Sequence, residues 1–181
     1  MPIEAYVIVS ADGMLADSRG VMPDSLKFHA DQTFFENALD DADLIVHGRH
    51  SHEEQARSNE RTRLVMTRST PALAPDVTRP HTTLWNPDGA TFEEACKASG
   101  VSPSAKIAII GGPHVYAFFL DRYDTFWLSQ AHDVRLPNGL GVLPGVPEIS
   151  PQDILAAAGL HAAETRVLDA GQHVDVTAWR R

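Results

Sequence analysis

The stretch IAIIGGPHVYAFFL, residues 107–120, changes character in its middle. Four apolar residues typical of a buried strand precede Gly111-Gly112-Pro113, and a second apolar run follows. Proline suits the first turn of a helix, because the N–H that it lacks would have no partner there. We therefore expect a strand over 107–110, a tight turn at the glycines and a helix through about Asp121.

Two interpretations of the glycine pair stay open from these residues alone. Without a Cβ, Gly111 and Gly112 let backbone N–H groups approach a diphosphate closely, and the following helix directs its positive end toward the same place. The other interpretation is a tight turn between strand and helix with no ligand. A single Gly-Gly pair does not decide between them.

The rest of the chain alternates between strand and helix patterns. Further strands are expected over 3–10, 44–47, 63–67, 82–85 and 125–132. Helices are expected from Asp24 to about Leu39, near 51–57, over 91–99 and within 147–159, and residues 161–181 read as a hairpin around Ala170-Gly171. This order predicts one α/β domain over 1–181, with a mainly parallel sheet and an antiparallel edge.

Composition excludes several classes of function. The 181 residues carry a formal net charge of −9, which argues against nucleic acid as a partner. No apolar run approaches the roughly 20 residues of a membrane span, and the first ten residues lack the basic region of a signal peptide. Cys96 is the only cysteine, which fits a reducing, cytoplasmic setting.

Polar residues follow two more of the predicted strands. Gly48-Arg49-His50-Ser51 comes after one strand, and Thr67-Arg68-Ser69 comes after the next. The carboxyl ends of parallel strands share one edge of a sheet, and a guanidinium between two hydroxyls suits a phosphate monoester. The alternative for Arg68 is a solvated arginine in a loop.

A metal site is not expected. His47, His50, His52 and Glu53 cluster in the sequence, but their spacing does not bring them to one helical face.

In this order, the motifs resemble those of the dihydrofolate reductase superfamily, most closely its branch with the reductase domain of riboflavin biosynthesis. The opening Ser10-Ala11-Asp12-Gly13 is similar to that branch's S-x-D-G, and 42–49 is similar to its AD-apolar-apolar-x-GR pattern. The stretches 67–69, 111–116 and 136–141 are similar to its later turns. The resemblance implies a three-layer α/β/α sandwich with a mainly parallel central sheet and an antiparallel C-terminal hairpin.

The resemblance also implies an NADPH-dependent reductase acting on a small heterocycle, such as 5-amino-6-(5-phosphoribosylamino)uracil. By position, the residues expected to contact the cofactor are Ala5, Ser10, Gly13, Gly48, Arg49, His50, Ser51, Thr67, Arg68, Ser69, Gly111, Gly112, Pro113, His114, Val115 and Tyr116.

The catalytic acid is less clearly marked. Folate reductases carry an acid early in the first helix, and this chain offers Asp24 and Asp31 there. Substrate contacts are expected from Asp12, Phe28, His29 and Phe35, and His29 is a further candidate proton donor. The tryptophan that precedes this helix in folate reductases is missing.

Alternatives remain for the activity and the assembly. The runner-up enzyme is a dihydrofolate or pterin reductase, and the rival from another class is a nucleotide-binding module that kept the fold and lost catalysis. A homodimer is expected from the family likeness and from the aromatic residues in 118–127.

Overall fold

A computed structural model describes residues 1–51 and 55–181. Most strands join one nine-stranded sheet in the order β10-β11-β8-β1-β7-β3-β4-β6-β5. The strands of this sheet are β1 (Ile3–Ser10), β3 (Leu44–Gly48), β4 (Arg63–Met66), β5 (Leu73–Pro75), β6 (Thr82–Trp85), β7 (Ile107–Ile109), β8 (Thr125–Ala131), β10 (His161–Asp169) and β11 (Val174–Arg180).

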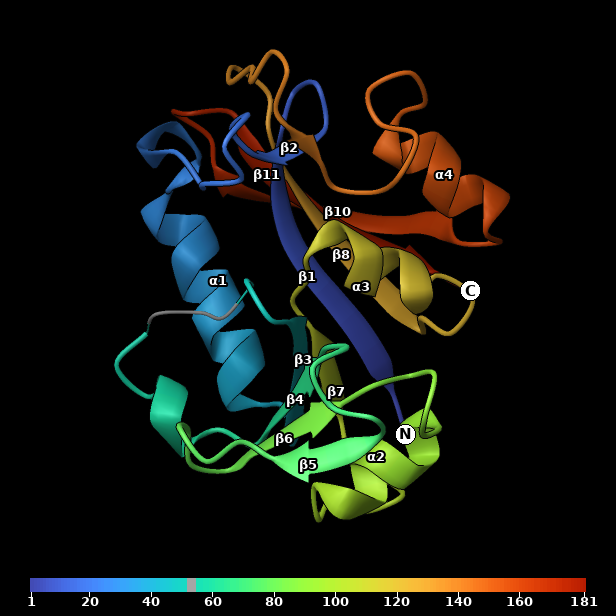
Figure 1. Cartoon of the computed structure of the whole chain (residues 1–181). Coiled ribbons are helices and arrows are strands. Elements are labelled where there is room, and N and C mark those ends of the chain that lie inside the picture. The colour runs from blue at the N-terminus through green and yellow to red at the C-terminus, as the bar shows by residue number, and fades with distance from the viewer. Residues whose placement is uncertain (52–54) are drawn as a thin grey trace.

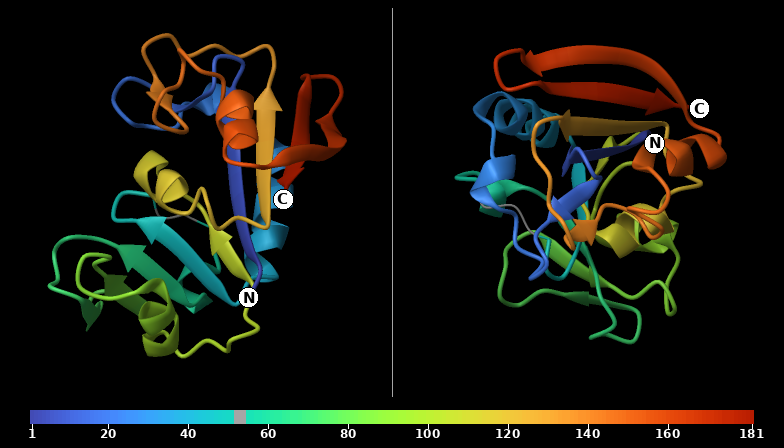
Figure 2. Two further views of the ribbon diagram at one scale, coloured as in Figure 1. Left: turned by 90° about the vertical axis from the view of Figure 1, so that its right-hand side faces the viewer. Right: turned by 90° about the horizontal axis from the view of Figure 1, so that it is seen from above.

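The sheet is mainly parallel with an antiparallel strand pair at the end of the chain, as expected. Strands β8, β1, β7, β3, β4 and β6 run parallel to one another. The hairpin of β10 and β11 adds to β8 in antiparallel fashion. The short edge strand β5 is also antiparallel, and no sequence pattern indicated it. Figure 2 shows β10 and β5 at opposite ends of the molecule.

Helices cover both faces of the sheet, which gives the expected three layers (Figure 1). The helix α1 (His29–Asp40) packs on one face, where Leu39 joins Ile45, Ala108 and Trp127 in an apolar cluster. The helices α2 (Phe92–Ala98), α3 (Pro113–Phe118) and α4 (Pro151–Ala157) pack on the other face, around a larger core.

The first helix begins later than its sequence pattern predicts. Residues Asp24–Leu26 form a short 3₁₀ helix, and α1 starts only at His29. Phe28, the N-cap residue, is extended, with φ −111° and ψ 132°. This conformation lets both Leu26 and Phe28 reach the same apolar cluster, which a continuous helix would not allow.

Other boundaries also differ from expectation. The α3 helix ends at Phe118 rather than near Asp121. The helix expected near 51–57 falls partly on residues 52–54, which lie outside the described residues, and the next element is the 3₁₀ helix η2 (Ser58–Glu60). The capping box of Thr91 and Glu94 is present as expected.

The aromatic residues of 118–127 are mainly core, and the homodimer expected partly from them stays a prediction. Phe119, Tyr123 and Phe126 are fully buried. Phe118 is partly exposed, but its ring packs edge-on against Trp85 at 5.5 Å.

Candidate functional site at the carboxyl ends of the central strands

The strand order places a topological switch point between the parallel strands β1 and β7. From β1 the chain crosses through α1, on one face, to β3, and from β7 it crosses through α3, on the other face, to β8. The two connections therefore leave neighbouring strands toward opposite sides. In open α/β sheets, ligands bind at the carboxyl ends of the strands at such a point.

The sheet also divides at this point. Strand β1 pairs with β7 only over Ile3–Ala5, whereas it pairs with β8 from Glu4 to Ser10. Just beyond the division, the Tyr116 hydroxyl of α3 donates a 2.8 Å hydrogen bond to the backbone oxygen of Tyr6. The carboxyl half of β1 thus extends past β7, and the glycine turn lies where the two strands separate.

The topology brings the three predicted turns together, because β7, β3 and β4 are neighbours in this order. Gly48 is level with Met66 of β4, and its N–H donates a 2.7 Å hydrogen bond to the Gly111 oxygen. The turn after β3 therefore touches the turn after β7 directly and lies next to the turn after β4.

Each glycine of this cluster is required for a different reason. Gly111 has φ +100°, and an added Cβ would lie 2.8 Å from the Tyr116 ring. Gly112 has φ −77°, which any residue adopts, and an added Cβ would lie 3.0 Å from Ser51 Oγ. An added Cβ at Gly48 would lie 3.3 Å from Val115 Cγ2. Gly111 thus serves the fold, whereas Gly112 keeps space between two turns.

The turn after β4 presents an arginine to solvent. Thr67 Oγ1 accepts a 3.1 Å hydrogen bond from the Ser69 N–H and donates to Ser69 Oγ at 3.0 Å, which fixes the turn. Arg68 between them is exposed, and no hydrogen bond or ion pair to it is found among the described residues. Arg49 and His50 of the preceding turn are exposed too, with Arg49 Nε 3.4 Å from His50 Nε2.

Asp31 is the buried acid of this region. It lies in the first turn of α1 and is 7% exposed. Burial raises the pKa of Asp31 to about 6, although a hydrogen bond from the Ser129 hydroxyl on β8 acts in the opposite direction. The charge of Asp31 also acts on Tyr116, whose ring lies against the glycine turn. Burial is the main cause that raises the pKa of Tyr116, and the Asp31 carboxylate is the second.

Ser129 was not predicted as part of this site. It is 2% exposed and faces α1 from β8, between Leu128 and Gln130. A hydroxyl within a buried strand, a feature that Ser129 shares with Thr125, was the signal in the sequence that could have indicated it.

The other candidates around the first helix divide into two groups. Phe28, the extended N-cap residue of α1, is buried in one apolar cluster, and Phe35 of α1 packs half-buried against another. His29 is exposed at the helix start. Asp24 has a side chain that is 98% exposed and pairs with Lys27 at 3.1 Å, so the geometry does not support it as a catalytic acid.

The opening loop is held by its own polar groups. Ser10 Oγ donates to Asp12 Oδ1 at 2.5 Å and accepts the Met14 N–H at 3.0 Å. Asp12 also accepts the Leu136 N–H at 3.0 Å. Its partial burial opposes ionisation, but these hydrogen bonds lower the pKa of Asp12. The Asp12 carboxylate therefore holds two loops together, and its expected role as a substrate contact stays a prediction.

These two loops form a small sheet of their own. The strands β2 (Met14–Ala16) and β9 (Leu140–Gly141) pair in antiparallel fashion, so that the late 136–141 motif lies against the opening motif. Gly13 has φ +83°, and an added Cβ would lie 2.8 Å from Val146 Cγ1. Gly13 thus belongs to a packed junction.

Several residues expected to contact the cofactor have side chains inside the core. Ala5 is fully buried and pairs with Ile109 of β7. Val115 and Tyr116 are 4% and 2% exposed, and they support the turns from within. Pro113 and His114, by contrast, open α3 at partly or fully exposed positions. The side chains of Ala5, Val115 and Tyr116 thus lie behind the turn residues, and their expected contact with a cofactor stays a prediction.

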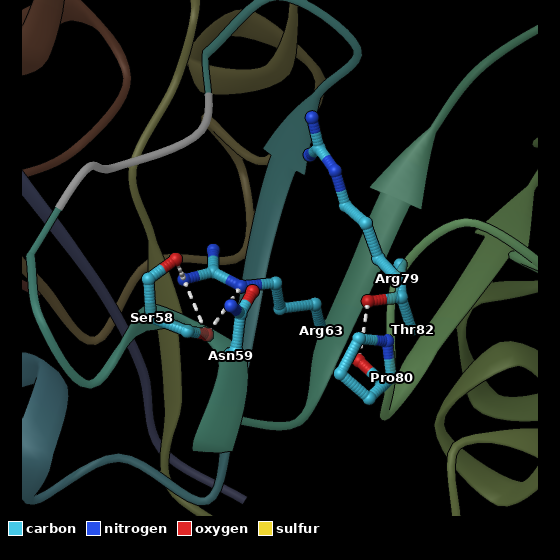
Figure 3. A pocket seen from close by; sticks show the side chains of 6 residues that line it. All are labelled: Ser58, Asn59, Arg63, Arg79, Pro80 and Thr82. Carbon is cyan, nitrogen blue, oxygen red and sulfur yellow. Dashed lines mark hydrogen bonds between the residues drawn. The ribbon is translucent and has the colours of Figure 1, made fainter.

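Two cavities lie at the opposite edge of the sheet. One, of about 110 Å³, lies where β4 and β6 begin, and Figure 3 shows Arg63 within it, bonded to Ser58, with Thr82 nearby. The second, of about 390 Å³, is adjacent and shares Arg79 and Thr82. Strand topology places ligand sites at the carboxyl ends, so we do not assign the predicted chemistry to these cavities.

Two of the four residues considered for a metal lie within the part of the chain that the structure describes. His47 is buried on β3, with Nδ1 2.8 Å from the Gly48 oxygen, while His50 is exposed. His52 and Glu53 lie outside the described residues. Among the helices of the described residues, none combines the length and apolarity needed to cross a bilayer.

Comparisons with known proteins identify the fold. No family profile and no curated protein matches the sequence. Among solved structures, a putative riboflavin biosynthesis protein from Shewanella sp. PV-4 is similar at a TM-score of 0.70 and 18% identity, over 100% of this chain and 99% of that one. Dihydrofolate reductase from Enterococcus faecalis, complexed with NADP(H) and RAB-propyl, is similar at 0.66 and 16%, over 99% and 96%.

A third similar structure has two activities in its description. It is a diaminohydroxyphosphoribosylaminopyrimidine deaminase/5-amino-6-(5-phosphoribosylamino)uracil reductase from Thermotoga maritima, with a TM-score of 0.63 and 14% identity. The likeness covers 99% of this chain but 56% of that protein. The resemblance found in the motifs is confirmed at the level of architecture: this chain has the dihydrofolate reductase-like fold shared by riboflavin-pathway reductases.

Proposed function

We propose that this protein is an NADPH-dependent reductase that transfers hydride to a small heterocyclic substrate. The observation that carries the proposal is the meeting of three turns, after β7, β3 and β4. They meet at the carboxyl ends of the strands, beside the topological switch point between β1 and β7. One turn supplies paired glycines, one a Gly-Arg pair and one an exposed arginine between two hydroxyls. A dinucleotide with several phosphates needs such a series of donors along its length.

The residues present fit this cofactor. Gly112 lies where an added Cβ would fill the space between two turns, and Gly48 lies where it would meet Val115, so both positions keep the backbone free of a side chain at this edge. Arg49 and Arg68 are exposed cations of a chain that carries −9 overall. Gly112 and Arg49 would hold the diphosphate, and Arg68 with Ser69 would hold the 2′-phosphate. When bound, NADPH would supply the hydride.

Asp31 would handle the proton. A carboxyl whose pKa is raised to about 6 by burial still carries a proton in a useful fraction of molecules near neutral pH. The Ser129 hydroxyl orients this carboxyl from β8, and Asp31 is only 7% exposed, which limits its access to water. This arrangement favours a catalytic protein over a module that only binds nucleotide.

Two substrate classes are supported by different observations. The motif order and the similar structures favour a pyrimidine intermediate such as 5-amino-6-(5-phosphoribosylamino)uracil. The buried acid in the first turn of α1 is the feature that favours the second candidate, a dihydrofolate or pterin reductase.

The test is an absorbance assay at the NADPH band with each candidate substrate. We expect NADPH oxidation with the pyrimidine, and a loss of at least about 100-fold in kcat for Asp31→Asn. Oxidation with dihydrofolate alone would establish the second candidate. Measurable NADPH binding without oxidation of either would identify a binding module, and no binding would refute the proposed function.

A further inference from the structure

The outermost strand β10 differs from the other edge of the sheet. The opposite edge, β5, has three residues and ends in Pro75, which protects an edge from pairing. Strand β10 has nine residues and no proline, and most of its side chains are exposed. Among them, the apolar residue Val167 is 70% exposed. A long edge of this kind is a template for another strand.

The sequence of β10, HAAETRVLD, is complementary to itself when reversed. With Thr165 placed opposite a second Thr165, Glu164 faces Arg166 on both sides of the centre. The next positions pair Ala163 with Val167 and Ala162 with Leu168, and the ends pair His161 with Asp169. Antiparallel pairing of two copies around this centre therefore sets opposite charges and apolar residues against each other.

We propose that two copies of this chain associate through β10, in antiparallel register centred on Thr165. The two sheets then continue into each other across a two-fold axis. Such an isologous contact closes on itself, because each copy has one β10 and its other edge is blocked. The occupant of this edge is thus a second copy of the chain.

The charges around Glu164 leave room for this contact. Its Oε1 accepts hydrogen bonds from Arg166 at 3.0 Å and Arg180 at 2.8 Å, while its Oε2 accepts none among the described residues. Both arginines also stack on Trp127, at 5.0 and 5.7 Å from the ring centroid. The side chains are therefore held in place, and Glu164 Oε2 is available to Arg166 of the second copy.

The overall charge makes this surface suitable for two acidic molecules. Residues 161–181 contain three acids, Glu164, Asp169 and Asp175, and three arginines, Arg166, Arg180 and Arg181, so their sum is zero. The chain as a whole carries −9, so all of the excess lies elsewhere. The hairpins therefore add no net like charge where two copies meet.

Two irregularities in β10 limit the length of the new ladder. Its register against β11 shifts between Ala162 and Glu164 and again between Val167 and Asp169. The central residues Glu164–Val167 are regular, and they include the threonine centre and the charge pairs. We therefore expect a short ladder whose specificity comes from Glu164 and Arg166.

The first test is sedimentation equilibrium at micromolar protein with charge variants. We expect the full chain to be a dimer. Arg166→Glu and Glu164→Arg should each weaken it by roughly tenfold or more, since each creates two like-charge contacts. The double exchange Glu164→Arg with Arg166→Glu should restore the dimer, and Lys97→Glu, the same charge change on α2, should leave it unchanged.

The second test uses single thiols and does not depend on the charge variants. Thr165→Cys places two thiols opposite each other at the centre, about 4.5–5.5 Å apart between Cα atoms, within disulfide range. Val167→Cys, the matched control, places its thiols about 13 Å apart. Mild oxidation should cross-link only the first variant, since the native Cys96 is buried. A monomeric wild type, or equal cross-linking of both variants, would overturn the proposal.

Discussion

Asp31→Asn tests whether the buried acid is maintained at the expense of stability. The substitution keeps the size of the side chain and leaves an amide oxygen to accept the Ser129 hydrogen bond, but it removes the ionisable group. Asp31 is 7% exposed, and burial raises its pKa from 3.8 to about 6. The pH dependence of unfolding therefore separates the ionisable group from its shape.

The sign of the effect follows from proton binding. Between about pH 4 and pH 6 the folded protein holds a proton on Asp31 that the unfolded chain has already lost. Stability contributed by this group is therefore lost as the pH rises through that window, and the loss is complete above the folded-state pKa. The asparagine variant has no such dependence.

The magnitude follows from the same two values. One pKa unit corresponds to about 1.4 kcal/mol, so a rise from 3.8 to about 6 makes the ionised Asp31 cost about 3 kcal/mol at pH 7.5. Relative to wild type, the free energy of unfolding of Asp31→Asn should therefore increase by about 3 kcal/mol between pH 4 and pH 7.5.

The assay is urea unfolding of both proteins at a series of pH values. Asp24→Asn is the matched control, because its side chain is 98% exposed and the variant should stay within about 0.5 kcal/mol of wild type throughout. A difference between Asp31→Asn and wild type that does not change with pH would refute the reasoning. So would the same pH-dependent difference for Asp24→Asn.

Three further substitutions test the turns. Gly112→Val should abolish NADPH binding in a fluorescence titration with an unchanged circular dichroism spectrum. Unchanged binding would favour the other interpretation of the glycine pair, a tight turn with no ligand. Gly111→Ala should lower the stability by more than about 1 kcal/mol in thermal unfolding, because its φ is +100° and Tyr116 lies against it; a smaller loss would contradict this. Arg68→Ala should weaken NADPH binding by roughly 10- to 100-fold and leave NADH binding nearly unchanged, and equal losses for both would assign Arg68 to the diphosphate or the fold.

The sequence predicted the parts of the fold that depend on local pattern. Buried parallel strands such as 44–47 and 107–110 are short apolar runs with clear ends, so their positions were correct to within about a residue. The meeting of the turns was predicted because the carboxyl ends of parallel strands share one edge of the sheet. In the structure the Gly48 N–H accordingly donates a 2.7 Å hydrogen bond to the Gly111 oxygen.

The elements that were missed depend on long-range contacts. The strands β2 and β9 have three and two residues and exist because the opening and late loops meet. The late start of α1 has a similar cause, since Leu26 and Phe28 are drawn into one apolar cluster. The helical spacing of apolar residues from Asp24 onward does not indicate that Leu26 and Phe28 share a cluster.

The choice between the two candidate acids likewise needed the tertiary structure. The linear pattern does not decide between Asp24, at the start of the predicted helix, and Asp31, one to two turns further on. Only the fold shows that one side chain is in solvent and the other lies beneath the helix, beside Ser129. Burial, which decides the pKa, is a property of the assembled core.

The position of Asp31 bears on whether catalysis is retained. A protein that only bound nucleotide would gain stability at neutral pH by replacing this acid with an uncharged side chain of similar size. The turns after β7, β3 and β4 would still hold a nucleotide, because none of their backbone contacts involves Asp31. A costly buried acid, held by a hydroxyl from another strand, therefore supports the proposal that its proton is used.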